Sequence, residues 1–557
     1  PYLLTNHRKL LGSARSHSIR TITEADSRTA KQLDVVHSPV LICLPRLADK
    51  ASIGMKRKAV IIGAGYGGLS AAAELARAGW DITVLEAHIY PGGCAGTFYN
   101  QGYTFEAGAT LAGGFAHGAV MDLLGKHFGI DWESRPDSLA IQVHLKNHKV
   151  INRWSDEDQW RDERQYKMGS NGEPFWEWQK NTANLLWDFA LQLPAWPPQR
   201  LSDFRSIIKS SMEWIQAPSF RGNFRALPKM TADAIRPVAA HLPPGSDLLR
   251  LFVDAQLLIA SQTTSQYANA LYGAVALDLP RQGVVHLEGG IGSMANRLVE
   301  KIEHYGGVVH MRHEVIRVIH KPPDATEVYT KHNGAFTADV VVFNLPPWNI
   351  ITLIHGAIPA KLGNLPEQPR DGWGAFMLYL GVDETAVPSD LPLHHQIVTR
   401  EPLGEGNSVF LSISPTWDQN RAPAGKRALT VSTHTKLSPW WELFHSDPQG
   451  YEARKEIYQS RVLSAVEQAI PGTQRALDLI MPATPVTFQR FTRRAWGWVG
   501  GFPQTSLLRP WGPRLAPNMW MVGDSIFPGQ SVPAVMLGGL RTAGAILTEY
   551  APNTASS

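Results

Sequence analysis

A short apolar run at residues 59–62 leads directly into a glycine-rich turn at residues 63–68. Apolar positions then recur with helical spacing over residues 69–76, and a second apolar run covers residues 82–85. This pattern predicts a buried strand, a helix that begins within the turn, and a second strand that ends at Glu86.

Similar patterns predict elements along the rest of the chain. Helical periodicity covers residues 175–193, 248–259, 451–469 and 532–550, and strand patterns cover residues 376–382, 409–413 and 519–522. Proline-rich breaks interrupt the helical stretches at residues 193–198 and 242–245. A chain of 557 residues exceeds one ordinary hydrophobic core, so we expect two interleaved domains of the α/β class.

The glycine-rich turn has the spacing that a dinucleotide requires. Gly63 permits the tight turn, Gly65 lets the backbone approach a pyrophosphate, and Gly68 lets the helix close onto its strand. The free N–H groups at the start of the helix then face the phosphates. A carboxylate at Glu86 can accept both ribose hydroxyls and disfavours a 2'-phosphate. Glycine-rich turns also form for steric reasons alone, but the complete unit predicts a nucleotide of the adenosine diphosphate type.

Further glycine-containing blocks follow this unit. Gly92 and Gly93 come shortly after Glu86, and a second glycine-dense stretch covers residues 102–110. Far downstream, Gly523 and Asp524 end a strand and precede a helix rich in small residues. Glycines keep the backbone close to a second part of a ligand, an Asp at this position can hold a ribityl hydroxyl, and a helix N-terminus can lie beneath a flavin ring.

These blocks resemble the FAD-dependent amine-oxidase-like superfamily and, within it, the branch of carotenoid desaturases and isomerases. The resemblance implies that FAD is the cofactor and that Val315 contacts the adenine through its backbone. The residues that it assigns to cofactor binding are Gly63, Gly65, Tyr66, Gly67, Gly68, Glu86, Ala87, Gly92, Gly93, Gly108, Ala109, Thr110, Val315, Gly523, Asp524, Val532 and Pro533.

The resemblance also implies the domain organisation. A dinucleotide-binding, Rossmann-like FAD domain is expected from the discontinuous residues 55–115, 282–350 and 481–557, and an interleaved α+β substrate domain from residues 116–281 and 351–480. Residues 1–54 are expected to be a disordered or non-native leader. The alternative is a plastid transit peptide, against which the four acidic residues of this segment argue.

Cys94 marks a departure from the amine oxidases. Those enzymes usually place Arg after the paired glycines, and many attach flavin to a C-terminal cysteine, whereas no Cys follows Cys94 in this chain. A polyene substrate is therefore favoured over an amine. Four stretches are similar to cyanobacterial carotenoid 3',4'-desaturases, at residues 376–382, 394–396, 491–494 and 500–505.

The narrower resemblance implies a desaturase that removes two hydrogens from a carotenoid, at the 3',4' position, by hydride transfer to flavin N5. Two alternatives remain open: a carotenoid cis-trans isomerase that uses reduced FAD, and a non-catalytic lipid-binding or escort protein of the same fold. Because the chain has one nucleotide fingerprint, NAD(P) is disfavoured as electron acceptor, which leaves oxygen or a quinone. A hydrocarbon gains about 0.8 kcal/mol per buried CH₂, so we expect a cytoplasmic protein in peripheral contact with the plasma or thylakoid membrane.

The sequence assigns no catalytic base. Glu106 lies close to the expected flavin contacts, with a structural carboxylate as the competing interpretation. Arg493 and Arg494 precede a glycine-rich turn and are candidates to face the ring or the polar end of a substrate, with ion pairs to nearby acids as the alternative. His394 and His395 are adjacent on a predicted strand and point to opposite sides, so no metal site is expected.

Charge and composition narrow the classes of protein and partner that remain possible. Residues 1–54 hold eight Lys/Arg against four Asp/Glu and account for the net charge of +4, so the basic isoelectric point gives no argument for nucleic-acid binding. Only Cys94 lies outside the expected leader, so the body cannot form an internal disulfide. The 18 tryptophans are expected either to fill an aromatic core or to line a polyene tunnel or a bilayer interface.

Overall fold

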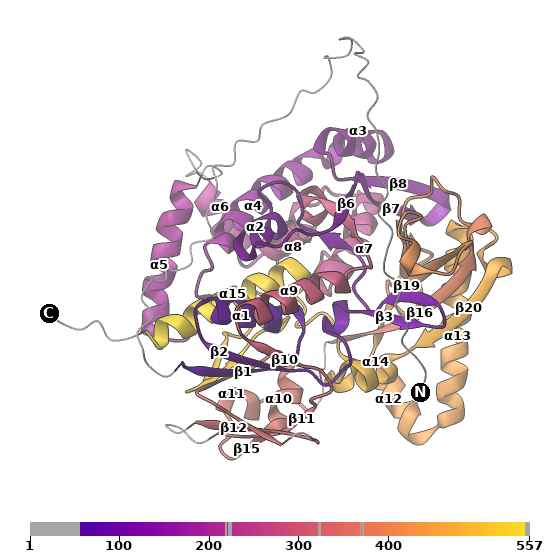
Figure 1. The fold of residues 1–557 in the computed structure, drawn as a ribbon. Helices are drawn as coiled ribbons and strands as arrows, with labels where there is room; N and C mark the ends of the chain where they lie inside the picture. Colours follow the sequence, from indigo (N-terminus) through magenta and orange to yellow (C-terminus); the bar gives the residue numbers. More distant parts are fainter. Residues whose placement is uncertain are drawn as a thin grey trace, which may run out of the picture. The chain divides into compact units, whose positions relative to one another are not determined.

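The structure, a computed structural model, describes residues 56–217, 220, 226–320, 325–332, 334–367, 369 and 372–551 (Figure 1). The expected leader, residues 1–54, lies outside these residues. The fold class is α/β, as the sequence predicts, with two large sheets and the helices that cover them.

The six-stranded sheet carries the glycine-rich turn. Strand β1 (Lys58–Ile62) lies in its interior, parallel to both β2 (Asp81–Leu85) and β14 (Val340–Phe343). The order is β10-β2-β1-β14-β22-β21, in which β10 is Val308–His310, β22 is Met519–Met521 and β21 is Arg514–Ala516. Segments that are hundreds of residues apart thus form one sheet, and β14 is buried throughout because both faces are covered.

Helices pack on one face of this sheet. Figure 1 shows α1 (Tyr66–Arg77), α9 (Gly292–His304) and α15 (Val532–Glu549) together on this face. Their apolar side chains share one core with β1 and β2. On the other face, a second core joins the sheet to α10 (Pro347–Leu353), α11 (Ala360–Gly363) and a four-stranded sheet. The strands of that sheet, in spatial order, are β13 (Ala335–Ala338), β12 (Thr326–Thr330), β11 (Val315–Ile319) and β15 (Ile354–His355).

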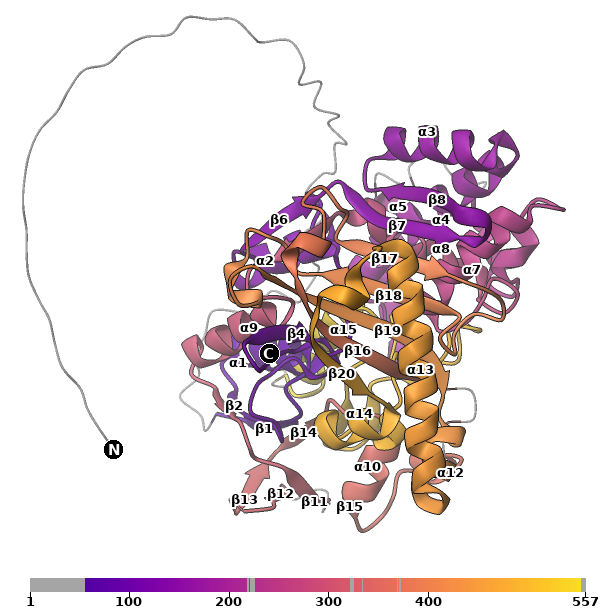
Figure 2. The same ribbon diagram turned by 90° about the vertical axis from the view of Figure 1, so that its right-hand side faces the viewer.

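The seven-stranded sheet forms the second layer of the fold. Its order is β20 (Leu477–Ala483), β16 (Trp373–Asp383), β19 (Lys426–Lys436), β18 (Ser408–Ile413), β17 (His394–Val398), β7 (Leu139–Leu145) and β8 (Lys149–Trp154). Figure 2 shows α13 (Pro448–Ala469) lying across one face of this sheet, next to α12 (Ser438–Ser446). Side chains alternate along β16: Phe376 and Leu378 pack with α13, whereas Met377 and Tyr379 point to the opposite face. That opposite face borders the candidate site.

In residues 116–281 the sequence pattern predicts helices, whereas the structure also contains strands there, including β7 and β8. Strand β7 pairs in parallel with β17, so the two parts of the expected substrate domain share one sheet. The alternation of buried and half-exposed positions in β7 is typical of a strand.

The helices predicted from apolar periodicity are confirmed with small shifts at their ends, as α4 (Glu173–Leu191), α7 (Asp247–Ser261), α13 and α15. The remaining elements are α2 (Val120–Phe128), α3 (Glu157–Met168), α5 (Leu201–Gln216), α6 (Ala226–Asp233), α8 (Ala270–Ala276), α14 (Pro485–Thr492), β3 (Thr97–Asn100), β4 (Tyr103–Glu106), β5 (Ala112–Gly113), β6 (Ser134–Asp137) and β9 (Val284–Leu287). Among the described helices, none combines the length and the apolar character needed to cross a membrane.

Candidate active site

A cavity of about 2060 Å³ lies against both large sheets. Side chains of α4, α5, α7, α8 and α15 also line it. Ligand pockets commonly measure about 300–1,000 Å³, so this cavity has room for a dinucleotide together with a second large ligand.

The glycine-rich turn forms one end of the cavity. Gly63 adopts a φ of +99°, and its N–H donates to the Leu85 carbonyl at 2.8 Å, which ties the turn to β2. A Cβ on Gly67 would lie 2.9 Å from the backbone nitrogen of Gly523, so the turn touches the C-terminal block. Gly65 is the N-cap of α1 and has no side chain to cap it, which leaves the first N–H groups of the helix free for a phosphate.

Glu86 anchors two loops at the same end. Its Oε2 atom accepts the Ala64 N–H at 2.7 Å, and its Oε1 atom accepts the His88 N–H at 2.8 Å. Burial raises the pKa of the Glu86 carboxyl, and these backbone donors oppose that shift. Glu86 lines the cavity together with Ala87 and Val315, as expected for a residue that meets a ribose.

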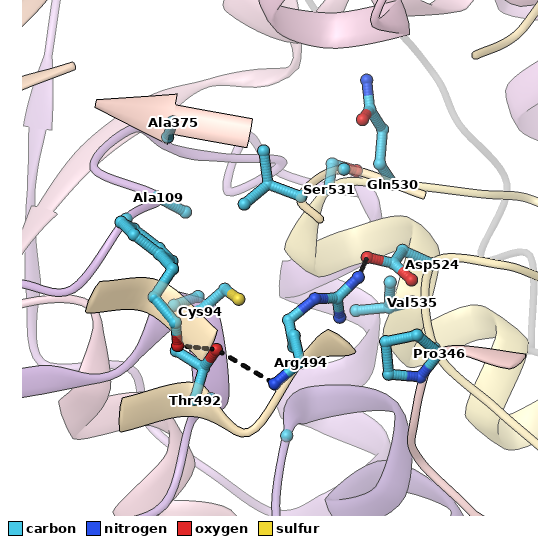
Figure 3. Close-up of a pocket in the computed structure, with 18 of the residues that line it drawn as sticks. Cys94, Ala109, Pro346, Ala375, Thr492, Arg494, Asp524, Gln530, Ser531 and Val535 are labelled. Atoms are coloured by element: carbon cyan, nitrogen blue, oxygen red, sulfur yellow. Dashed lines mark hydrogen bonds and ion pairs between the residues drawn. The ribbon is translucent and has the colours of Figure 1, made fainter. Parts of the chain in front are cut away.

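The loop that carries the paired glycines, Gly92 and Gly93, packs against the glycine-rich turn. Gly92 donates its N–H to the Ala64 carbonyl at 2.8 Å and forms an isolated parallel bridge with Gly65. The Cys94 carbonyl that follows accepts the Ala109 N–H at 3.0 Å. This bond connects the loop to residues 108–110, and Figure 3 shows Cys94 and Ala109 facing the same pocket. Gly93, Gly108 and Thr110 line the cavity as well.

The C-terminal block completes this end of the cavity. Gly523 and Asp524 follow β22, and Val532 begins α15; all three line the cavity with Tyr66 of α1. Glu86, Val315 and Asp524, which come from three distant parts of the chain, therefore border one cavity.

Two of the expected cofactor residues do not line the cavity. Gly68 packs against the Gly63 carbonyl, to which a Cβ would come within 2.5 Å, and Pro533 is buried beside Gly114.

Arg494 is paired with Asp524. The Arg494 Nη2 and Asp524 Oδ2 atoms lie 2.7 Å apart (Figure 3). Arg494 Nε donates to the Trp498 carbonyl at 2.7 Å. Burial lowers the pKa of the Arg494 guanidinium, but Asp524, with a smaller contribution from Cys94, outweighs it and raises that pKa above its ordinary value, so Arg494 is charged. Arg493 lines the cavity too, but its side chain is half exposed and its Nε lies 3.4 Å from Glu314 Oε1.

Glu106, the weak catalytic candidate, lies outside the lining of the cavity. Its Oε1 atom is 2.8 Å from Arg421 Nη2, and its Oε2 atom accepts the Thr97 hydroxyl at 2.7 Å. The Ile291 N–H also reaches this carboxylate at 3.2 Å. These contacts favour the structural interpretation, because each of these side-chain bonds ties β4 to another segment of the chain.

The seven-stranded sheet supplies a wall that sequence reasoning missed. Cavity-facing side chains of its strands include Ala375, Met377, Tyr379, Gln396, Ser408, Phe410, Ser432, His434 and Met481. The signal in the sequence was the two-residue alternation, since Phe376 and Leu378 between them face the core. An aromatic wall is formed by α4, α5 and the loop between them, and it includes Trp187, Phe189, Trp196 and Trp214. Trp176 and Trp440 are instead buried in cores, so some of the tryptophans line the cavity and others fill hydrophobic cores.

The adjacent histidines of β17 point to opposite sides. His394 Nδ1 lies 2.8 Å from Ser412 Oγ, and His395 Nδ1 lies 3.0 Å from His144 Nε2. Burial lowers the pKa of His394 well below 6.5 and that of His395 to about 4, and neighbouring histidines add to both shifts. In the described part of the chain, no group of three or more His, Cys, Asp or Glu side chains is arranged to hold a metal ion.

The residues present fit a dinucleotide cofactor. The uncapped N-terminus of α1 meets Gly92, Gly93 and Gly523, where added Cβ atoms on Gly67 or Gly92 would collide with backbone. The Glu86 carboxylate also lines the cavity, as does the ion pair between Arg494 and Asp524.

Comparison with known proteins agrees with this geometry. The sequence profile of the family described as flavin containing amine oxidoreductase matches residues 66–547. The chain is 25% identical to the chloroplastic prolycopene isomerase of Daucus carota over 544 residues, covering 93% of this chain and 85% of that protein. It is 24% identical to a lycopene-forming phytoene desaturase of Paracoccus sp., covering 89% and 98%.

Solved structures share the fold. A triple mutant of putrescine oxidase aligns with a TM-score of 0.58 at 13% identity, covering 89% of this chain and 99% of that one. An oxidoreductase from Methanosarcina mazei aligns with a TM-score of 0.54 at 18% identity, covering 87% and 99%.

Proposed function

The chain belongs to the flavin-containing amine oxidoreductase family, and from that premise we propose that it is an FAD-dependent carotenoid desaturase that acts at the 3',4' position. The observation that carries the proposal is the continuity of the cavity, which runs from the glycine-rich turn to the aromatic wall. Relatives named as phytoene desaturases support a carotenoid substrate. When bound, FAD supplies N5 as the acceptor of a hydride from an allylic carbon, while the neighbouring carbon loses a proton.

The protein's own residues hold the two ligands and keep water out. The glycine-rich turn, Glu86 and the pair of Arg494 and Asp524 would hold the nucleotide, and Val315 would contact its adenine through the backbone. Apolar side chains from α4, α7 and β16 bury the polyene, which gains about 0.8 kcal/mol per CH₂. No residue is assigned as a base, because a conjugated polyene spreads developing positive charge and lowers the need for one. Oxygen or a quinone would accept the two electrons from the bound cofactor.

Carotenoid cis-trans isomerisation with reduced FAD is the second candidate. Chloroplastic prolycopene isomerases are 25–27% identical to this chain, which favours it. Expression in a carotenoid-accumulating host separates the two functions by product mass. A desaturase yields a pigment two hydrogens lighter, and an isomerase yields one of unchanged mass. A colourless purified protein that leaves the pigments unaltered would contradict both and favour an escort role.

Helix α5 supports peripheral membrane contact. Leu201, Phe204, Ile208 and Met212 are spaced to share one face of the helix and are 53–87% exposed. On an adjoining face of the same helix, Ile207 and Trp214 line the cavity.

Two further observations support a membrane-facing role for this apolar face. Leu508 is 69% exposed and follows Leu507, which lines the cavity. The exposed Arg205 and Lys209 flank the apolar face and suit an anionic bilayer. We therefore propose that α5 docks on the lipid and that the polyene enters beside it. Sedimentation with liposomes tests this, and full retention of the protein in the supernatant would contradict it.

A further inference from the structure

Arg541 is a buried guanidinium with one edge left free. It lies on α15 and is less than a tenth exposed. Its Nη1 atom donates to the Trp196 carbonyl and, at 3.5 Å, to the Pro194 carbonyl. Its Nε and Nη2 atoms are buried and have no hydrogen-bond partner among the described residues.

The free edge of Arg541 is the one that binds carboxylates elsewhere in this chain. The Nε and Nη2 atoms of Arg164 each donate to one oxygen of Glu173 at 2.8 Å. The same two atoms of Arg281 donate to the two oxygens of Asp278 at 2.8 and 2.7 Å. These two N–H groups match a single carboxylate because they point in parallel. Arg541 presents the same fork without an acceptor in it.

The Tyr272 hydroxyl is a second buried group without a partner among the described residues. Tyr272 lies on α8, lines the cavity and is less than a tenth exposed. Burial raises the pKa of its phenol, and the positive charge of Arg541 opposes that rise. The two side chains are therefore close enough to interact, and both hold unused donors.

These donors lie at the apolar wall of the cavity. The Arg541 Cζ atom is 5.7 Å from the centroid of the Phe527 ring, and the centroid of the Tyr272 ring is 6.4 Å from the same ring. Phe527 lines the cavity, as do Leu271 and Val275 on the helix that carries Tyr272. A ligand bound here would have its polar end at Arg541 and its apolar part in the cavity.

The charge of Arg541 indicates which polar end fits. Burial lowers its pKa to about 10, against the opposing effects of Tyr272 and Asp203, so Arg541 is still charged at neutral pH. A buried charge without a partner is costly, and so is a buried donor without an acceptor. A carboxylate satisfies both, because its two oxygens occupy the fork and one of them also accepts from the phenol.

We propose that Arg541 and Tyr272 bind the carboxylate of a long-chain acid whose hydrocarbon tail occupies the cavity. The inference goes beyond the proposed function, since it concerns binding and holds for any reaction that the cavity carries out. Such an acid would compete with the polyene for the same space. Its source is either a free fatty acid of the bilayer or a polyene that ends in a carboxylate.

The test is a binding titration of the FAD-loaded protein with two acids and their methyl esters. The fatty acid is cis-parinaric acid, and the polyene acid is all-trans-retinoic acid. Quenching of tryptophan emission reports binding, since Trp187, Trp196 and Trp214 line the cavity. We expect at least one acid to bind about tenfold or more tightly than its ester, and the acid that does so identifies the source.

Arg541→Met removes the fork. We expect this variant to bind acid and ester equally, to bind the ester as the wild type does, and to retain FAD. Tyr272→Phe keeps the ring and removes the hydroxyl, so the preference for the acid should fall about threefold or more. It also decides the question if Arg541→Met does not fold.

The matched control is Arg427→Met. Arg427 is also buried, but its Nε and Nη2 atoms both donate to the Ser414 carbonyl, and it lies outside the lining of the cavity. This variant should keep the preference for the acid.

Equal affinities of the wild type for each acid and its ester would overturn the inference and leave the proposed function standing. An unchanged preference in Arg541→Met or in Tyr272→Phe would overturn it too, because the carboxylate would then be held elsewhere. Release of FAD by the acid would also overturn it, since the acid would then occupy the nucleotide end of the cavity. The pigment assay tests the proposed function separately.

Discussion

Arg494 and Asp524 form an ion pair inside the cavity, with Arg494 Nη2 2.7 Å from Asp524 Oδ2. Among the described residues, the other carboxylate oxygen, Oδ1, accepts one long bond, of 3.4 Å, from the Ser525 hydroxyl. Asp524 can therefore pair with Arg494 through one oxygen and offer the other to a ribityl hydroxyl.

Arg494→Met is expected to weaken FAD binding by at least about tenfold and to lower the melting temperature of the apoprotein. The Asp524 carboxylate would remain in the cavity without its partner, and an unpaired charge in such a site costs about 3–5 kcal/mol. Fluorescence titration with FAD measures the first effect, and thermal unfolding measures the second.

Arg493→Met is the matched control for this variant. Arg493 is adjacent in sequence, but its side chain is half exposed, so both quantities should stay near the wild-type values. Equal losses in the two variants would contradict the role assigned to the buried pair.

Gly67→Ala is expected to abolish stoichiometric FAD binding and to cost about 1–3 kcal/mol of stability. The new Cβ would lie 2.9 Å from the nitrogen and 3.1 Å from the Cα atom of Gly523, and backbone cannot move aside as a flexible side chain does. The ratio of flavin to protein after gel filtration measures the effect. In Gly363→Ala the new Cβ meets nothing within 4 Å, so that variant should retain its flavin.

Glu106→Gln is expected to reduce the free energy of unfolding by about 3–5 kcal/mol, because it leaves the buried Arg421 guanidinium without its charge partner. Urea unfolding monitored by tryptophan emission gives the value. If the variant is as stable as the wild type but forms no product in the pigment assay, Glu106 is catalytic and the structural interpretation is wrong.

The double variant Phe204→Glu, Ile208→Glu is expected to lower binding to anionic vesicles by about tenfold or more. Each side chain contributes about 1.5–3 kcal/mol when fully buried in lipid, and the new charges repel the surface. Ile457→Glu serves as control, since Ile457 is 55% exposed on α13. A similar loss in the control would mean that α5 is not the docking element.

The protein is expected to lose stability as the pH falls from about 6.5 toward 4. Burial, reinforced by His144, lowers the pKa of His395 to about 4, and burial alone lowers that of His434 to about 4. Between these values and 6.5 the unfolded chain binds more protons than the folded one, so stability rises with pH by up to about 1.4 kcal/mol per pH unit for each histidine.

Urea unfolding midpoints between pH 7 and pH 5 measure this dependence. His395→Gln should show a shallower slope, because one proton fewer is taken up on unfolding. An unchanged slope would mean that His395 does not contribute.

The sequence predicts the nucleotide end of the site well because its signals are local. The turn at Gly63 and the strand runs beside it are set by neighbouring residues, and Glu86 follows at the end of β2. These features carry their meaning within about thirty residues of chain. The three blocks that the resemblance assigns to FAD then border one cavity.

The rest of the site depends on contacts between residues far apart in the chain. Gln256 meets Gln396 across 140 residues, and Arg421 meets Glu106 across more than 300. The sequence pattern around any of these four residues does not identify the residue that it contacts. Strand β7 escapes prediction for a different reason. Its positions alternate between buried and half-exposed, as in a strand, but the helical periodicity of the surrounding segments favours a helical interpretation of residues 116–281.

The position of β1 inside its sheet has a consequence for how the protein is made. Strand β14, its second neighbour, begins 278 residues after β1 ends. At ribosomal rates of about 5–20 residues per second, that strand emerges roughly a quarter of a minute to a minute later. During this interval an apolar β1 edge waits unpaired, which is the stage at which a chaperone would protect the nascent chain.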